Sequence, residues 1–445
     1  MGEEIVCESI KILLFVQGER RFFRLCLKWL AMNYKDEVLH LIPYVREYGR
    51  WDDLFELFDT PCEPEMLGYI KWALDKGEDH LLAKWMPSIN TSSKNTQERG
   101  RKFAREFGMS EKEYRKMLSQ ERKYCNLVET LMSQNRWNEI EFSKLPSRAG
   151  LLYSKAFARR EETRERYAEF MRSDKTTVNA GALYPYDVVR KAVVAMGSDD
   201  YWNYSNISLN DTNRLAANKY WDNLEDGYFK DATLNALCVC DTSGSMTSAY
   251  NRSNVRPIDV AISLALFTAE RAKGPFQNHF ISFSSHPTLI ATIGVDFCDK
   301  VDKIYRQNLC ENTNIEATFD LILNTAIINH LSQKDLPETI IIVSDMQFDA
   351  AQGYYSRYNH YDSTLMENIE AKWNYAGYQM PHLVFWNVNA SMSNNIPMED
   401  KDGITYVSGA SPSILKQVMT GVTGQELMLQ TLESDRYKDI FSISR

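Results

Sequence analysis

The spacing of apolar residues divides the chain into two parts. Up to about residue 230, apolar side chains recur every three or four positions in short segments separated by turns, which is typical of helices. From Leu234 onward, short apolar runs of strand length alternate with helical segments, the pattern of a parallel sheet. We therefore predict a helical array over 1–230 and an α/β domain over 231–445, with Gly227 marking the turn between them.

Turn and capping residues bound the helices of the first part. Ser110 and Glu113 have the spacing of a capping box and predict a helix that runs to about Lys123. Pro43 lies inside another helical segment, which we expect to bend or break there. The other predicted helices are Glu19–Met32, Asp36–Tyr48, Trp51–Phe58, Pro64–Leu74, Cys125–Ser133, Ser147–Phe157, Glu161–Arg172, Tyr186–Met196 and Asp211–Asn223. They indicate either an irregular helical-repeat array with an extended surface, or a compact bundle that packs against the second part.

The second part predicts strands and helices in alternation. The expected strands are Leu234–Cys240, Asn278–Phe283, Thr288–Ile293, Thr339–Ser344, His382–Val388 and Ile404–Val407. The third of these is expected to pair antiparallel with the second, and the fourth is the most hydrophobic, which suits the centre of the sheet. The expected helices are Pro257–Lys273, Asp296–Tyr305, Asn314–Leu331, Leu365–Tyr375, Ser413–Met419 and Gln425–Leu432.

The first predicted strand ends in a carboxylate followed by two hydroxyl groups. After Cys240 the chain reads Asp241-Thr242-Ser243-Gly244-Ser245, and open α/β sheets bind their ligands at this carboxyl edge. Hard oxygen ligands of this kind suit Mg²⁺ or Mn²⁺ rather than a soft metal. For these residues taken alone, the alternative is a hydrogen-bonded turn after the strand.

These residues resemble the metal-ion-dependent adhesion site of von Willebrand factor A domains. Asp241, Ser243 and Ser245 match its D-x-S-G-S signature, and Thr313 and Asp345 follow in the order that this family requires. The resemblance implies that Ser243, Ser245 and Thr313 contact Mg²⁺ (or Mn²⁺) through their hydroxyls, while Asp241 and Asp345 hold it largely through bridging waters. It implies metal-dependent binding of an acidic residue of a protein partner, without turnover.

Further blocks resemble a family described as domain of unknown function 2828. They include Leu145–Ala149, Gly181–Pro185, Ser344–Asp349 and Val384–Asn387, and the resemblance extends from about Gly18 to Leu415. The architecture is also similar to that of the TROVE-module Ro autoantigen proteins, which bind small structured RNAs through a helical ring. The resemblance implies an α + α/β fold: an N-terminal α-helical, TROVE-like (HEAT-like) array followed by a Rossmann-like doubly wound von Willebrand factor A domain. It also implies a Ro-like RNA-binding scaffold of ribonucleoproteins.

Charge is distributed unevenly along the chain. The net charge is −9, yet residues 99–175 carry 19 basic and 12 acidic side chains, a surplus of seven positive charges. This segment supplies candidate nucleic-acid contacts at Arg115, Lys116, Arg122 and Lys123. Solvated helix faces with intrahelical ion pairs are the alternative. The overall acidity favours the alternative function, a metal-dependent protein-binding module that uses no RNA.

Known catalytic motifs are absent from the sequence. There is no H-E-x-x-H, no P-loop and no G-x-G-x-x-G. Ser243 and Ser245 lack the G-x-S-x-G elbow of a hydrolase nucleophile. Asp241 lacks the second aspartate, two positions later, of the phosphoryl-transferring family. We therefore expect no catalytic residues and no enzyme activity.

The remaining sequence features indicate the compartment and one further surface. The eight cysteines show no metal-ligand spacing, the first residues do not form a secretory signal, and no apolar stretch reaches membrane-spanning length. We expect a cytoplasmic protein without membrane contact. The tyrosine-rich segment Gly353–Tyr361 follows the Asp345 loop and suggests either a contact surface for a partner or a self-packed loop.

Overall fold

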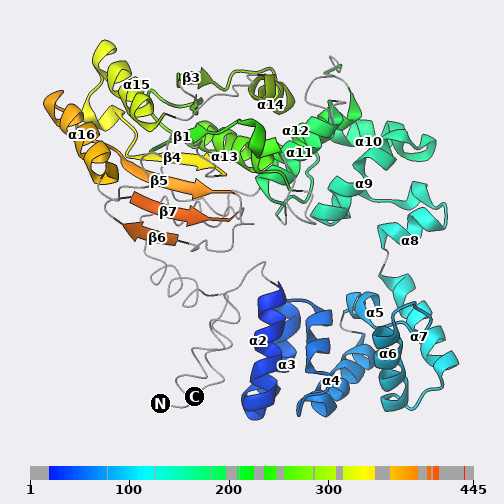
Figure 1. The fold of residues 1–445 in the computed structure, drawn as a ribbon. Helices are drawn as coiled ribbons and strands as arrows, with labels where there is room; N and C mark the ends of the chain where they lie inside the picture. Colours follow the sequence, from blue (N-terminus) through cyan, green and yellow to red (C-terminus); the bar gives the residue numbers. More distant parts are fainter. Residues whose placement is uncertain are drawn as a thin grey trace. The chain divides into compact units, whose positions relative to one another are not determined.

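The computed structural model describes most of the chain, in several stretches. The described residues are 20–77, 79–125, 127–181, 183–196, 208–209, 211–224, 235–247, 255–283, 286–306, 314–345, 361–388, 398–401, 404–409 and 435. They form two compact units: the first contains the described residues up to Ile140 together with Asp435, and the second contains those from Glu141 to Gly409. Figure 1 shows helices in the first unit, and helices followed by a sheet in the second.

The first unit is built of helices. Its elements are α2 (Arg20–Asn33), α3 (Lys35–Tyr48), η1 (Trp51–Leu57), α4 (Glu63–Lys76), α5 (Leu81–Trp85), α6 (Lys94–Glu106), α7 (Glu111–Tyr124), α8 (Val128–Ser133) and η2 (Trp137–Glu139). Of the two effects expected at Pro43, a bend or a break, the break does not occur, since α3 continues through this residue. Val38, Leu41, Ile42 and Val45 are buried on both sides of the proline, and this packing offsets the hydrogen bond that proline cannot donate.

Capping and aromatic packing fix the helices of this unit. The predicted capping box of α7 is present: the Ser110 amide donates to Glu113 Oε2 at 2.8 Å, and Ser110 Oγ accepts from the Glu113 amide at 3.3 Å. In the core, the rings of Phe55 and Phe58 meet the Phe103 ring edge-on, with centroids 5.7 and 5.4 Å away. These contacts join η1 to α6.

The second unit combines helices and the sheet. Its helices before the sheet are α9 (Ser147–Arg159), α10 (Glu161–Arg172), α11 (Pro185–Ala195) and α12 (Thr212–Asp222), preceded by the short turn η3 (Phe142–Lys144). The indole of Trp221, on α12, stacks on the Phe297 ring of α14 (Phe297–Arg306) at a centroid distance of 4.1 Å. The compact units therefore do not coincide with the change from helices to strands in the sequence.

The seven strands of the sheet follow the order β3-β2-β1-β4-β5-β7-β6. They are β1 (Ala236–Cys240), β2 (His279–Ser282), β3 (Thr288–Ala291), β4 (Thr339–Ser344), β5 (His382–Asn387), β6 (Met398–Lys401) and β7 (Ile404–Ser408). Strands β2, β1, β4, β5 and β7 are parallel, while β3 and β6 pair antiparallel at the two edges. The predicted antiparallel pairing of the second and third strands is confirmed, and β4 lies at the centre as expected.

Helices cover both faces of the sheet. Phe319 of α15 (Ile315–Ile328) and Trp373 of α16 (Tyr361–Tyr375) are buried in one cluster with Val239 of β1 and Ile342 of β4. On the other face, α13 (Pro257–Arg271) contacts β1, β2 and β4, and it also packs against α11. Since α13 lies between the sheet and a helix, it is buried from its first residue to Ala269.

Some expectations differ from the structure or fall outside it. Strand β6 has no counterpart in the sequence prediction, because its polar residues show no apolar run, and α16 begins at Tyr361 rather than Leu365. Thr313, most of the tyrosine-rich segment and the last two predicted helices lie outside the described residues. Within the described residues, no helix combines the length and the apolar character needed to cross a lipid bilayer.

A partly buried ion pair links α12 to the start of α14. Arg214 donates from Nε and Nη2 to the two carboxylate oxygens of Asp296, each at 2.8 Å, and Asn218 donates to the same carboxylate at 2.8 Å. Burial raises the pKa of Asp296, but the hydrogen bonds from Arg214 and from the Asp299 amide outweigh it, so the pKa lies below its ordinary value. The pair therefore stabilises the ionised carboxylate.

Replacing this carboxylate is expected to destabilise the sheet unit. Asp296→Asn removes the negative charge to which the largely buried Arg214 donates, and we expect a loss of about 3 kcal/mol in the free energy of unfolding, measured by urea denaturation at pH 7. Because the pKa of Asp296 is lowered in the folded chain, its stabilisation is present above about pH 4 and disappears as the pH falls through the folded value.

The exposed ion pair between Lys372 and Glu316 provides the control. Both side chains are 44% exposed, so Glu316→Gln should cost less than about 1 kcal/mol. Equal losses in Asp296→Asn and Glu316→Gln, or a loss in Asp296→Asn that does not shrink in acid, would contradict this account of the ion pair.

Candidate functional site

The candidate site lies where the strand order of the sheet reverses. From β1 the chain adds β2 and β3 on one side, and it then returns to add β4 and β5 on the other. Ligands of open α/β sheets bind outside the carboxyl ends of the strands at such a switch point. Asp241 directly follows β1 and Asp345 directly follows β4.

Backbone pairing holds the two aspartates side by side. Cys240 is in register with Val343, and the Asp241 amide donates to the Val343 carbonyl at 3.0 Å. The hydroxyl of Ser344 donates to Asp241 Oδ2 at 2.6 Å, which ties the two strand ends together. Both aspartates are buried, with 2% and 3% of their surfaces exposed. The structure thus brings together two of the predicted ligands that lie far apart in the sequence.

The turn after β1 adds the two predicted hydroxyls. Asp241 Oδ1 accepts from the Ser243 amide at 2.9 Å, an Asx-type bond that bends the chain. The turn continues as η5 (Gly244–Thr247), and Ser243 Oγ lies 3.1 Å from Ser245 Oγ. Both serines are partly exposed, and a Cβ added at the exposed Gly244 would meet no atom within 4 Å. The hydroxyl side of the turn is therefore accessible to a ligand.

The electrostatics of the site favour a cation. The pKa of Asp241 lies above its ordinary value, chiefly because the carboxylate is buried and also because Asp345 is a neighbouring negative charge. Hydrogen bonds from Ser344 and Ser243 lower this pKa but do not outweigh the burial. Two adjacent buried carboxylates repel each other when both are ionised, and a divalent cation would relieve this repulsion. The residues present therefore fit a hard cation.

The donor set relies on hydroxyls as much as on carboxylates. The described part of the chain holds no group of three or more His, Cys, Asp or Glu side chains placed to bind a metal. A cation here would be coordinated by Asp241, Asp345, the two serine hydroxyls and water, which suits Mg²⁺. The place of Thr313 lies outside the described residues. Sequence reasoning missed Ser344, whose role follows from the register of β4 against β1.

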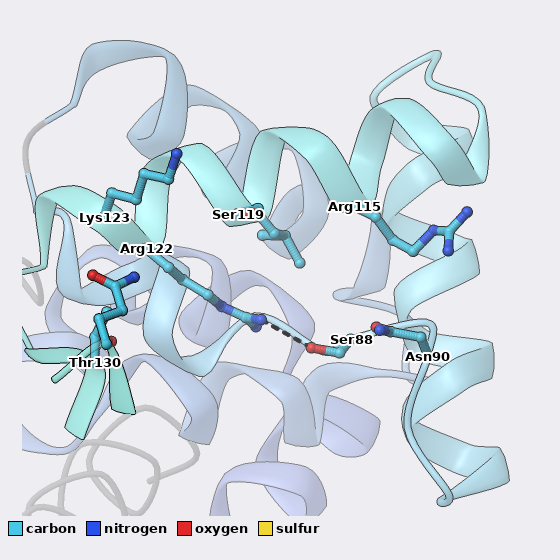
Figure 2. Close-up of a pocket in the computed structure, with 9 residues that line it drawn as sticks. Ser88, Asn90, Arg115, Ser119, Arg122, Lys123 and Thr130 are labelled. Atoms are coloured by element: carbon cyan, nitrogen blue, oxygen red, sulfur yellow. Dashed lines mark hydrogen bonds between the residues drawn. The ribbon is translucent and has the colours of Figure 1, made fainter. Parts of the chain in front are cut away.

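The predicted nucleic-acid contacts lie on α7 in the first unit and differ in their surroundings. Arg115, Arg122 and Lys123 line one pocket, whereas the exposed Lys116 does not. Figure 2 shows Arg122 extending from α7 toward Ser88, to whose hydroxyl it donates at 3.0 Å. Arg122 also donates to the carbonyls of Ala83 and Met86, at 2.8 Å each. Arg122 thus binds the backbone around the end of α5 as well as lining the pocket.

Two family models match adjoining parts of the chain. Residues 80–234 match the model described as Domain of unknown function (DUF2828), and residues 235–439 match Domain of unknown function (DUF7788). The first match confirms the expected resemblance to domain of unknown function 2828 over that segment. The residues that carry the candidate metal site match the second model.

Individual proteins are similar over longer stretches. An uncharacterized protein of Acanthamoeba polyphaga mimivirus is 28% identical in an alignment of 376 positions that covers 79% of this chain and 60% of the relative. The chain thus spans about 60% of the length of this curated relative. The crystal structure of the Deinococcus radiodurans RO (RSR) protein covers 94% of this chain and 93% of its own, at 14% identity and a TM-score of 0.47. Over residues 80–439, this chain is therefore similar to two adjoining families of unknown function.

Proposed function

We propose that this protein is a non-enzymatic binding module that holds Mg²⁺ or Mn²⁺ at the carboxyl ends of β1 and β4. Through the ion it binds a carboxylate of a protein partner. The observation that carries this proposal is the burial of Asp241 beside Asp345 at the switch point of the sheet, with two accessible hydroxyls next to them.

Each residue of the site has a role in this proposal. Asp241, Ser243, Ser245 and Asp345 would hold the ion, together with Thr313 as the sequence pattern predicts. The bound ion supplies an open coordination position for one carboxylate oxygen. Ser344 orients Asp241 through its hydrogen bond, and the exposed Gly244 leaves room for the incoming group.

Cation binding is expected to stabilise the fold. Only the folded chain brings Asp241 and Asp345 together, so Mg²⁺ or Mn²⁺ at a hundredfold excess over its Kd should add about 2.7 kcal/mol to the free energy of unfolding. Differential scanning calorimetry should show a higher melting temperature with the ion than with EDTA. Asp241→Asn should abolish this difference.

Thr242→Val is the matched control for the cation test. Thr242 is buried beside Asp241, and among the described residues its hydroxyl has no hydrogen-bond partner. Its replacement by valine removes a buried polar atom without touching the ligands, so stability should be unchanged or higher. The full cation-dependent shift should remain. A shift that persists in Asp241→Asn, or is lost in Thr242→Val, contradicts the site.

The partner's contribution is expected to be a carboxylate. Peptides selected by the full chain from a random phage-displayed library in Mg²⁺ should be enriched in Asp or Glu and should elute with EDTA. The same selection on Asp241→Asn should yield no such enrichment. Peptides that bind equally well in EDTA would place recognition elsewhere on the protein.

We also propose RNA binding by the helical unit as a second function. The observation that favours it is the side of α7 that carries Arg115, Lys116 and Lys123, which are exposed and form no ion pair with another described residue. Exposed cations on one helix attract phosphate at long range. The sequence resemblance to Ro-like architecture points to the same class of ligand.

RNA binding of this kind is expected to depend steeply on salt. Binding of a structured RNA hairpin, measured by filter retention, should weaken by about tenfold or more between about 50 and 200 mM salt, because phosphate contacts release counterions. Replacing Arg115, Lys116 and Lys123 together by glutamine should weaken binding and flatten this dependence.

Three other exposed lysines of the same unit serve as the charge control. Replacing Lys28, Lys76 and Lys94 by glutamine removes the same charge away from α7 and should leave binding within about twofold. An equal effect of the two triple variants would assign binding to net charge alone. A chain that ignores the hairpin at low salt would rule out the RNA function and leave the cation site untouched.

A further inference from the structure

A cationic cavity lies between α7 and the chain that follows α5. It has a volume of about 290 Å³, and Figure 2 shows the residues that line it. Arg115, Ser119, Arg122 and Lys123 come from α7, while Ser88 and Asn90 come from the segment between α5 and α6. None of the residues that line this cavity is acidic. Its wall therefore combines three cations with hydrogen-bonding side chains.

Arg122 is the fixed cation of this cavity. Its three hydrogen bonds, to Ala83, Met86 and Ser88, use three of the five N–H groups of the guanidinium. All three acceptors are neutral, and burial lowers the pKa of Arg122. A guanidinium remains charged under these conditions. Arg122 thus offers a preorganised positive charge that an anion in the cavity would stabilise.

Arg115 and Lys123 add exposed cations at either end of the same wall, and Arg115 Nε donates to the Glu111 carbonyl at 3.3 Å. They are eight positions apart, which is about 12 Å along the helix, with Arg122 between them. Both are exposed, and neither forms an ion pair with another described residue. The side chains of Arg115 and Lys123 are therefore available to an anion next to Arg122.

A second cavity of about 330 Å³ adjoins the first and differs in character. Lys123, Thr130 and Gln134 line both cavities, and Leu127 and Leu131 give the second an apolar wall. Arg136 also lines it, but its charge is matched by Glu139. Gln134 Oε1 accepts from Arg136 Nη1 at 3.0 Å, so the amide nitrogen of Gln134 is left to donate. The first, cationic cavity is thus continuous with a second cavity that has an apolar wall and the side-chain amide of Gln134.

From this pairing we propose that the two cavities bind one nucleotide. The phosphate would lie in the cationic cavity against Arg122, with both Arg115 and Lys123 within reach, and the base would rest on Leu127 and Leu131. A phosphate carries the charge and the acceptor oxygens that guanidinium groups recognise. The flat base matches the apolar wall, and its polar edge reaches the amide of Gln134.

The nucleotide can come from two sources with the same chemistry. It is either a free nucleoside monophosphate or one nucleotide of a single-stranded RNA. If the nucleotide belongs to an RNA, the proposal rests on the RNA-binding function proposed above and specifies where it occurs. If the nucleotide is a free monophosphate, the proposal is independent of that function. Full-length protein is therefore titrated separately with AMP, with inorganic phosphate and with a short single-stranded oligoadenylate, each by calorimetry at low salt.

Variants with matched charge test the location of binding. Arg115→Gln and Lys123→Gln each remove one cation and should weaken nucleotide binding by about tenfold, the effect of one charge-assisted hydrogen bond. Lys94→Gln removes the same charge from an exposed lysine that lines neither cavity, and it should leave binding within about twofold. Thr130→Phe fills the boundary between the cavities without a change of charge and should abolish binding. Circular dichroism checks that each variant folds.

The outcomes separate this proposal from the RNA function. The nucleotide site is supported if AMP or oligoadenylate binds more tightly than inorganic phosphate and if Arg115→Gln and Thr130→Phe lose this binding. The ligand that binds more tightly then identifies the source of the nucleotide. Oligoadenylate binding that these variants leave unchanged preserves RNA binding but overturns the site. Three other results overturn it as well: inorganic phosphate binds as tightly as AMP, Lys94→Gln weakens binding as much as Arg115→Gln does, or none of the three ligands binds.

Discussion

The parallel pairing of β1 with β4 is the constraint on which the candidate metal site depends. The two strands are adjacent over five residue pairs, and the pairing continues into the turn through the bond from the Asp241 amide to Val343. A slip of one residue would turn the side chains of β1 to the opposite faces of the sheet. The buried apolar residues of both strands oppose such a slip, so the core sets the position of Asp241 beside Asp345 and Ser344.

The same packing explains why the helices before the sheet belong to its compact unit. α13 covers one face of the sheet and also packs against α11, while the Arg214–Asp296 pair and the Trp221–Phe297 stack join α12 to α14. A sheet in an α/β fold needs apolar helices on both faces. Here the helices that precede β1 in the sequence bury the outer side of α13, so the sheet unit begins well before its first strand.

Local sequence pattern predicted most of the elements and four described residues of the candidate metal site. The apolar run of β4 and the capping box of Ser110 are set by neighbours in the sequence, whereas the polar β6 owes its conformation to its partner β7. Ser344 was missed because its acceptor lies 103 positions away. For Arg122, a count of charges could not reveal that neutral carbonyls hold the guanidinium.

The most direct test of the central claim is the position of a bound ion in the folded protein. Crystals grown with Mn²⁺ should show one anomalous-scattering peak at the carboxyl ends of β1 and β4, coordinated by the hydroxyls of Ser243 and Ser245 and linked to Asp241 directly or through water. Crystals of Asp241→Asn grown in the same way should lack it. A peak at another place, or none at a saturating Mn²⁺ concentration, would contradict the metal-dependent binding module proposed for this protein.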